Sequence, residues 1–274
     1  MAHHAVQSKH ISIRKACPLF GVSETCYRHV SKPSEINLKL EVKLIEITST
    51  KGQTTWGFAM CRDHIRHQVG WALNHKRIRR IYCKLNLNLR VNKRNRIVRA
   101  APQVLMVPMS TGQVLSIDFM HDNISDGRAV RSFNVIDDCN REGLVNEIDF
   151  SFPATRVTRI LDQLFEWRGT PAIIRSDNGP EFISKHFANW AKQRGIELWF
   201  TQPGNPQQNA YIERFNRTMR YELLNQHIFE SIEDMQNEAT QWLWCYNNNR
   251  PHLSLGGKTP AQAKAALNPK PVLH

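Results

Sequence analysis

The spacing of apolar residues along the chain changes near Gln113. Upstream of this point, apolar residues recur every three to four positions, a period that predicts amphipathic helices. The first two predicted helices flank a turn at Phe20-Gly21, and Ser23 is a suitable N-cap for the second, an arrangement typical of a helix-turn-helix. This part of the chain is therefore predicted to be all-α. The predicted helices are 11–18, 24–30, 34–48, 58–69 and 75–85.

Downstream of Gln113, short runs rich in Val, Ile and Phe predict β-strands. The predicted strands are 114–119, 130–136, 143–150, 172–174 and 196–200. The helical period returns between and after the last strands, at 154–167, 181–193, 209–226 and 231–247. Three consecutive strands followed by helices and strands in alternation predict the fold class, an α/β domain with a mixed five-stranded sheet and flanking helices.

Basic residues are concentrated in the first part of the chain. The chain has 37 Lys and Arg against 24 Asp and Glu, a net charge of +13, and residues 1–110 hold 20 of the basic but only 5 of the acidic residues. The densest basic run, 74–99, contains no acidic residue. Charge runs are common on solvated faces, but like charges at this density also repel one another unless an anionic partner neutralises them. We expect contacts with DNA phosphates at Lys76, Arg77, Arg79, Arg80, Lys93, Arg94 and Arg96.

Other classes of protein fit the sequence poorly. No apolar run approaches the roughly 18 residues of a membrane-spanning helix. Residues 1–15 carry His and charged side chains without the apolar segment of a secretory signal, so we expect a cytoplasmic protein. The six Cys form no C-x-x-C pair, so neither a disulfide framework nor a zinc ribbon is predicted.

Three carboxylates occur where a single site could collect them. Asp118 lies among apolar residues of the first predicted strand, Asp177 directly follows the fourth, and Glu213 lies near the start of a helix. A buried carboxylate is costly unless a cation compensates its charge. Oxygen ligands favour Mg²⁺ or Mn²⁺, and two such ions can activate the attacking oxygen and stabilise the leaving oxygen of a phosphodiester. The alternative for Asp177, which precedes Asn178-Gly179, is a turn-forming or capping role.

Two arginines share a helix face with Glu213. Arg217 and Arg220 follow it by four and seven residues. Guanidinium groups bind phosphate well, so we expect both arginines to contact DNA. Asp137 and Asp138, at the end of the second predicted strand, are expected to form turns or caps instead.

Longer motifs surround these residues. The motifs are Asp118-Phe119-Met120-His121-Asp122, Asn134-Val135-Ile136-Asp137-Asp138, Ser176-Asp177-Asn178-Gly179-Pro180-Glu181-Phe182 and Gln202-Pro203-Gly204-Asn205-Pro206-Gln207-Gln208-Asn209-Ala210-Tyr211-Ile212-Glu213-Arg214-Phe215-Asn216-Arg217-Thr218. In these motifs the sequence resembles the integrase core of the OrfB-type transposases of the insertion-sequence-three group. Segments 14–27 and 75–82 are similar to the family's N-terminal helix-turn-helix segments, so the resemblance covers nearly the whole chain.

The resemblance implies a ribonuclease H-like fold and a catalytic triad of Asp118, Asp177 and Glu213 that binds two Mg²⁺ ions, or Mn²⁺ in their place. It implies DNA cleavage at the ends of an insertion sequence and joining of the 3′-OH to target DNA. Arg220 matches a basic position at which the family contacts DNA. The implied partners are the terminal inverted repeats, the target DNA, further copies of the chain on DNA, and a segment encoded in an upstream reading frame. The implied location is bacterial, at the nucleoid when the protein is bound to DNA.

The chain also departs from the family pattern, and two alternative functions stay open at this stage. Leu115 stands where Trp is usual, Ser176 where Cys is common and Cys139 where Phe is common. None of these residues is an implied metal ligand. The first alternative is a non-catalytic or decayed DNA-binding protein that occupies element ends. The second is a nuclease of the same fold that hydrolyses DNA without joining it.

The patterns and the resemblance together predict three domains. Residues 1–50 are expected to form the helix-turn-helix and a connecting helix, and residues 51–108 a second basic helical segment and a linker. Residues 109–274 are expected to form the integrase core with its C-terminal helices.

Overall fold

The helices upstream of Gln113 lie close to their predicted positions. The structure, a computed structural model, describes residues 2–29, 34–89, 108–202 and 209–267. The chain forms two compact units, Met1–Lys43 and Leu44–His274. The three-domain division expected from the sequence stays a prediction. The basic linker and the Gly/Pro/Asn-rich loop fall almost wholly outside the described residues.

Short helices form the first unit. They are α1 (Ala2–Lys9), α2 (Ile13–Leu19), α3 (Glu24–Arg28) and the first part of α4 (Glu35–Ser49). The Ser23 hydroxyl accepts a hydrogen bond from the Cys26 amide at 3.1 Å, which confirms the predicted N-cap. Gly21, with φ of +63°, makes the turn between α2 and α3. Helix α1 was not predicted, because it lacks an apolar stripe and packs on α2 through the small side chains of Ala2 and Ala5.

The second unit begins with the rest of α4, followed by α5 (Phe58–His67) and α6 (His75–Lys84). The Asn74 side chain caps α6 by accepting a hydrogen bond from the Lys76 amide at 2.9 Å. One face of α6 is buried through Ile78, Ile81 and Tyr82. The opposite face carries Lys76, Arg79 and Arg80 into solvent, as the amphipathic pattern predicts.

A mixed five-stranded sheet, in the order β3-β2-β1-β4-β5, forms the centre of this unit and confirms the predicted fold class. Strands β1, β2 and β3 are antiparallel, whereas β4 and β5 run parallel to β1. Strand β1 is longer than predicted, because residues 120–123 continue to pair with β2 before the turn at Asp126-Gly127. The strands are β1 (Val114–Asn123), β2 (Ala129–Asp137), β3 (Gly143–Asp149), β4 (Ile173–Ser176) and β5 (Glu197–Phe200).

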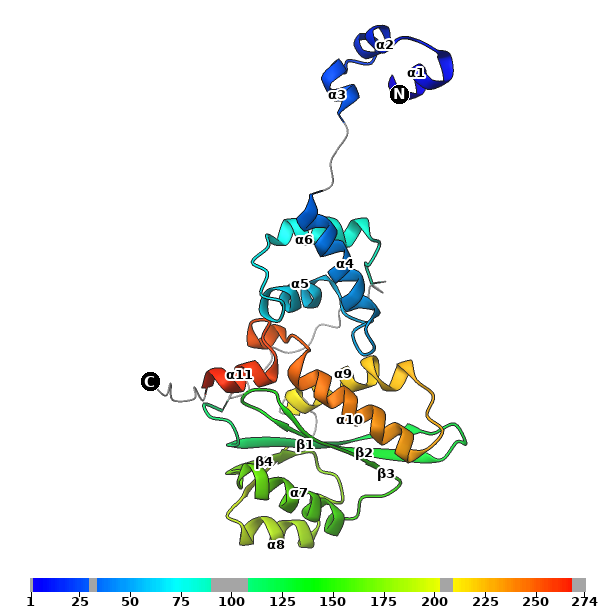
Figure 1. The fold of residues 1–274 in the computed structure, drawn as a ribbon. Helices are drawn as coiled ribbons and strands as arrows, with labels where there is room; N and C mark the ends of the chain where they lie inside the picture. The colour runs from blue at the N-terminus through cyan, green and yellow to red at the C-terminus, as the bar shows by residue number, and fades with distance from the viewer. Residues whose placement is uncertain (1, 30–33, 90–107, 203–208, 268–274) are drawn as a thin grey trace. The chain divides into compact units, whose positions relative to one another are not determined.

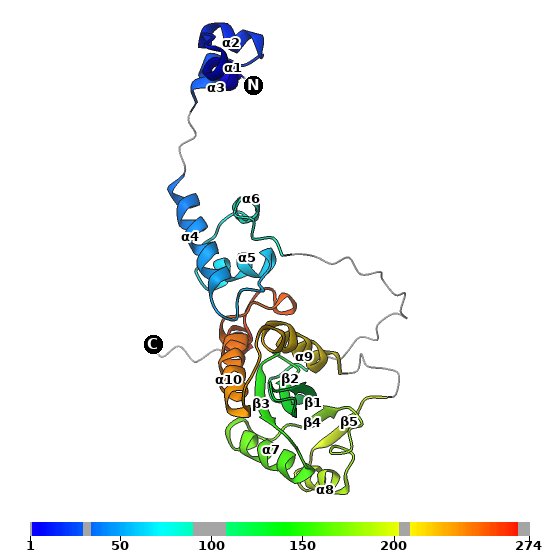
Figure 2. The same ribbon diagram turned by 90° about the vertical axis from the view of Figure 1, so that its right-hand side faces the viewer.

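Helices cover both faces of the sheet (Figures 1 and 2). Helices α7 (Ala154–Arg168) and α8 (Lys185–Gln193) enclose one apolar core, and α9 (Ala210–Glu222) and α10 (Ile232–Asn248) enclose the other. Helix α8 begins four residues later than predicted, because the Ser184 side chain caps it at the Phe187 amide. A further helix, α11 (Pro260–Leu267), was not predicted. In the described part of the chain, no helix has the length and apolar character needed to cross a membrane.

A close approach at Gly143 lets α9 and α10 pack against β3. A methyl group at Gly143 would overlap Leu243 of α10 and lie 2.8 Å from the ring of Phe215 of α9. Neither side chain has free space, since Phe215 is buried between Trp242 and Tyr246. The absence of a side chain at Gly143 therefore sets how closely α9 lies to the sheet.

We predict that Gly143→Ala lowers the free energy of unfolding by about 1–3 kcal/mol, the usual cost of an extra methyl group in a packed core. Urea unfolding followed by circular dichroism measures this loss. Gly57→Ser is the control, because a side chain there meets only Leu89, at an ordinary 3.7 Å. Equal stability of Gly143→Ala and the wild type would contradict this account of the packing.

Candidate active site

The pairing of two parallel strands places Asp118 and Asp177 side by side. Ser116 of β1 pairs with Arg175 of β4. Asp118 and Asp177 each follow two residues later, so they leave the sheet at the same level and on the same face. Asp118 is half-buried within β1, whereas Asp177 lies exposed just beyond the end of β4. The Asp177 carboxylate accepts a hydrogen bond from the Gly179 amide at 3.0 Å, so it also has the predicted turn-forming contact.

Helix α9 brings the third carboxylate to this face, because it packs against β1 and β2. Asn216 of α9 donates a hydrogen bond from Nδ2 to Asp118 Oδ2 at 2.8 Å. Glu213 precedes Asn216 by three residues and therefore lies on the same helix face, one turn away. Asp118, Asp177 and Glu213, predicted from three separate segments, thus border one space.

The carboxylates influence one another electrostatically. Burial is the largest of the causes that raise the pKa of Asp118 to about 7; the negative charges of Asp177 and Glu213 add to the rise, and hydrogen bonds from the Phe119 amide and Asn216 oppose it. Partial burial also raises the pKa of Glu213, which the positive charge of Arg217 opposes. The site therefore holds more negative charge than its protein surroundings compensate.

The donor chemistry fits a divalent cation. All three groups are carboxylates, the ligand type that Mg²⁺ and Mn²⁺ prefer. A cation between them would relieve the repulsion that raises the pKa of Asp118. Within residues 2–29, 34–89, 108–202 and 209–267, however, no three His, Cys, Asp or Glu side chains are close enough together to hold a metal ion. The carboxylates would therefore have to draw together around a bound ion.

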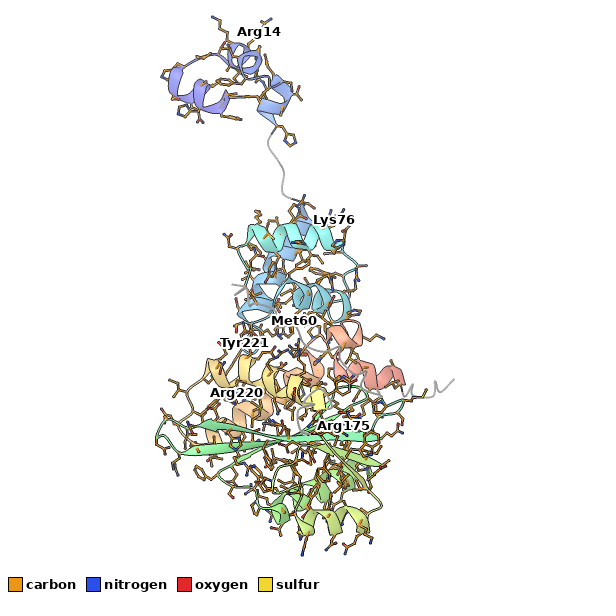
Figure 3. All side chains as sticks on the ribbon, turned by 180° about the vertical axis from the view of Figure 1, so that it is seen from behind. Arg14, Met60, Lys76, Arg175, Arg220 and Tyr221 are labelled. Carbon is orange, nitrogen blue, oxygen red and sulfur yellow. The ribbon has the colours of Figure 1, made fainter. Side chains whose placement is uncertain are left out.

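A basic cavity lies along α9, the helix that also carries Glu213. It has a volume of about 420 Å³ and is lined by arginines and polar residues. Arg250, which follows α10, is held in the cavity by Glu222 through a contact of 2.9 Å. Arg220 donates to the His121 carbonyl at 2.7 Å; Figure 3 shows its place on α9 beside Tyr221. The lining residues are Arg214, Arg217, Thr218, Arg220, Tyr221, Glu222, Asn225 and Arg250.

The other predicted DNA contacts divide into two groups. Lys76, Arg77 and Arg80 line a second open cavity, of about 540 Å³, at the start of α6, and Arg79 is exposed on the same helix. Figure 3 shows Lys76 on α6. The contacts predicted at Lys93, Arg94 and Arg96 lie outside the described residues.

The structure also adds residues that the sequence analysis missed. Arg131 of β2 lies over the ring of Phe119, 4.0 Å from its centroid, and pairs with Glu181 at 2.5 Å. Because Glu181 lies beside Gly179, the pair joins β2 to the loop that follows Asp177. Glu181 and Asn216 both lie within the motifs quoted above, but their contacts are with distant segments that a single motif does not reveal.

The comparisons with known proteins show the family of this chain. Two models described as "Integrase core domain" match residues 109–206 and 194–260. Over 263 residues, 95% of this chain and 94% of the other, the sequence is 35% identical to the insertion element IS407 uncharacterized 31.7 kDa protein of Burkholderia multivorans. The chain belongs to the OrfB-type transposases of the insertion-sequence-three group. Another relative is InsK of Escherichia coli, named as a candidate transposase for insertion sequence element IS150, at 25% identity over 72% of this chain and 73% of that protein.

A solved structure shares the fold of this OrfB-type chain. A chain of the simian T-cell lymphotropic virus intasome, solved in complex with PP2A regulatory subunit B56 gamma, matches with a TM-score of 0.52 and 17% identity. The match covers 85% of this chain and 76% of that chain. Two departures from the family pattern are buried. Leu115 is 3% exposed and belongs to the apolar core beneath α7, whereas Ser176 is 1% exposed at the end of β4 and its hydroxyl has no hydrogen-bond partner among the described residues.

A buried ion pair lies directly below the carboxylates. Asp138 is fully buried and pairs with Arg175 at 2.6 Å, while the Ser116 hydroxyl donates to its other oxygen at 2.6 Å. The turn or capping role expected for Asp138 is therefore wrong, because the end of β2 turns its side chain toward β4. The same expectation for Asp137 is confirmed, because its carboxylate accepts from the amides of Cys139 and Gly112.

Arg175→Met is expected to lower the free energy of unfolding by about 3–5 kcal/mol, because it leaves the Asp138 charge buried without its partner. Arg194→Met is the control: Arg194 pairs with Asp162 at 2.8 Å with both side chains about one-third exposed, and such a pair contributes about 0–1 kcal/mol. Urea unfolding measures both variants. If both variants lost the same free energy of unfolding, burial would not determine how much an ion pair contributes to stability.

Proposed function

We propose that this protein is a transposase that cleaves DNA at the ends of an insertion sequence and joins the 3′-OH ends to target DNA by Mg²⁺-dependent phosphoryl transfer. The observation that carries the proposal is that Asp118, Asp177 and Glu213 come near one another from β1, the end of β4 and α9, the helix that also lines an arginine-rich cavity. The relative named as a candidate transposase supports it. In this proposal residues 1–50 and 51–108 bind DNA, and residues 109–274 hold the catalytic site.

Asp118, Asp177 and Glu213 would hold two Mg²⁺ ions, with Mn²⁺ as a substitute. When bound, two such ions activate the attacking oxygen and stabilise the leaving oxygen of a phosphodiester. The Gly179 amide orients the Asp177 carboxylate, and the Phe119 amide and Asn216 orient that of Asp118. No side chain needs to form a covalent bond with DNA in this chemistry.

The arginines of α9 would bind the phosphates on either side of the reacting group. Arg217 lies one helical turn beyond Glu213 and Arg220 two, so the helix presents cations at increasing distance from the carboxylates. The partners proposed are the terminal inverted repeats and the target DNA. Joining two ends to a target calls for at least two copies of the chain on DNA, so we include a homo-oligomer and the upstream-encoded segment among the partners.

Glu213→Gln is predicted to abolish strand joining, with a loss of at least about 10³-fold, because it removes a carboxylate from the metal ligands. The assay uses labelled element-end DNA, a plasmid target and Mg²⁺ or Mn²⁺. Glu166→Gln, on the exposed face of α7 across the sheet, is the matched control and should retain activity.

The outcomes separate the alternatives. Cleavage without joined product would identify a hydrolytic nuclease. DNA binding without either reaction would identify a non-catalytic DNA-binding protein, or a chain that needs the upstream segment, which can then be added. Full activity of Glu213→Gln would refute the proposed metal site.

Loss of three basic residues on α6 is predicted to weaken DNA binding and flatten its salt dependence. Each phosphate contact contributes about 0.9 to the slope of log K against log salt concentration, so removing three contacts should lower the slope by roughly 2.7. The variant replaces Lys76, Arg79 and Arg80 with Gln, and fluorescence anisotropy at several salt concentrations measures the slope.

The matched control removes the same number of positive charges from exposed positions on α7 and α8. Its slope should equal that of the wild type, because these helices lie across the sheet from the carboxylates. An equal reduction in both triple variants would indicate a general effect of net charge rather than a binding surface on α6. The control replaces Arg159, Lys185 and Lys192 with Gln.

A further inference from the structure

A chain of hydrogen-bonded amide side chains ends at Asp118. Asn216 of α9 donates from Nδ2 to Asp118 Oδ2 at 2.8 Å, and Asn134 of β2 donates from Nδ2 to Asn216 Oδ1 at 2.8 Å. Asn134 Oδ1 accepts from Asn146 of β3 at 2.6 Å and from the Ser132 hydroxyl at 2.9 Å. The side chains beyond Asp118 are all buried, and Asn134 is fully so. The chain therefore runs from β3 across β2 to the carboxylate on β1.

The hydrogen bonds in this chain all point the same way. An amide group has a donor end and an acceptor end, so turning one amide over would place oxygen against oxygen or nitrogen against nitrogen at its neighbours. Asn146 Oδ1 accepts no hydrogen bond within the described residues, yet its Nδ2 is directed at Asn134. Turning this amide over would set two oxygens against each other in a buried space. Every donor is therefore directed toward Asp118.

The chain fixes the Asp118 carboxylate without neutralising it. Oδ1 accepts from the Phe119 amide at 2.8 Å and Oδ2 accepts from Asn216, so both oxygens are held by neutral donors. The charges that act on Asp118 are the carboxylates of Asp177 and Glu213. The neutral donors hold the Asp118 carboxylate in place, and each of its oxygens retains a further lone pair that can accept.

We propose that Asn134 and Asn216 are positioning residues for Asp118 and act as one unit, with Asn134 working through Asn216. This inference rests on the proposed function, since it assigns the two amides to the same carboxylate site. Asn134 is buried beneath α9 and does not reach the reacting atoms, so it is not a catalytic residue. Its role is to hold the Asn216 amide with the donor end toward Asp118. The proposal gives a function to Asn134 in the motif Asn134-Val135-Ile136-Asp137-Asp138, which contains none of the three proposed metal ligands.

A double-mutant cycle with Asn134→Ala and Asn216→Ala tests the proposal. Loss of a group that orients a metal ligand commonly lowers metal affinity or rate about 10- to 100-fold, and each single variant should show such a loss in Mn²⁺ affinity and in kcat for joining. The double variant should lose no more Mn²⁺ affinity or kcat than the more impaired of the two single variants, because either change breaks the same chain of hydrogen bonds. The KM for DNA should change by less than about twofold, because neither side chain contacts DNA. Electron paramagnetic resonance measures Mn²⁺ binding without DNA.

Asn140→Ala is the matched control. Asn140 is also a fully buried amide, and its side chain donates to Glu142 and to the Pro260 carbonyl, away from Asp118. It should lose stability as Asn134→Ala does but keep the Mn²⁺ affinity and kcat of the wild type. If Asn134→Ala does not fold, Asn146→Ala replaces it in the cycle, because it removes a donor to Asn134 and leaves the other contacts of Asn134 in place.

The outcomes distinguish this inference from the proposed function. A wild type that binds Mn²⁺ and joins DNA, with an Asn134→Ala variant that does both equally well, would overturn the positioning role alone. Multiplicative losses in the double variant would also overturn it, because they would show that the two amides act independently. A wild type that neither binds Mn²⁺ nor joins DNA would overturn both the inference and the proposed function.

Discussion

Burial of the Asp118 carboxylate is the constraint on which the candidate site depends. A carboxylate within a strand raises the free energy of the folded chain unless its surroundings favour the charged form, and burial is the main reason that the pKa of Asp118 is raised. The structure meets part of this cost with neutral hydrogen-bond donors, including the Phe119 amide and Asn216. In the proposed function, a bound cation would meet the rest.

The two faces of the sheet divide the structural roles. Because side chains alternate along β1, Ile117 and Phe119 enter the apolar core beneath α7 and α8, whereas Ser116 and Asp118 point to the opposite face. That face carries the buried Asp138–Arg175 pair below the carboxylates and the amide chain beside them. Placing the polar groups on one face leaves the other free for close apolar packing.

Helix α9 joins the carboxylate site to the cationic surface. Its buried side, with Phe215 against Gly143, fixes the distance between helix and sheet. One exposed side carries Glu213 and Arg217, and the flank carries Arg214 and the pocket shared with Arg250. Small changes in how α9 packs would therefore move a carboxylate, the Asn216 donor and the arginines together.

Sequence patterns predicted most of the elements and singled out the three carboxylates, and the family resemblance gave those carboxylates the role of a triad. Helical and strand periods located the five strands, and the cap at Ser23 was predicted from local chemistry, since it bonds an amide only three residues away. Helix α1 has no such signal. It is stabilised by small side chains packed against α2, and the spacing of apolar residues along the sequence does not predict such a contact.

The tertiary structure alone decided how the site is supported. Asn134 and Asn216 are 82 residues apart, and Asp138 and Arg175 are 37 apart, so no local pattern joins either pair. Their contacts exist because β1, β2 and β4 are neighbours in the sheet and α9 crosses them. Local sequence determines which segments form helices and strands, because the period of apolar residues follows the geometry of each element. Which polar groups meet beneath α9 depends on strand order and register, and those are set by packing across the whole domain.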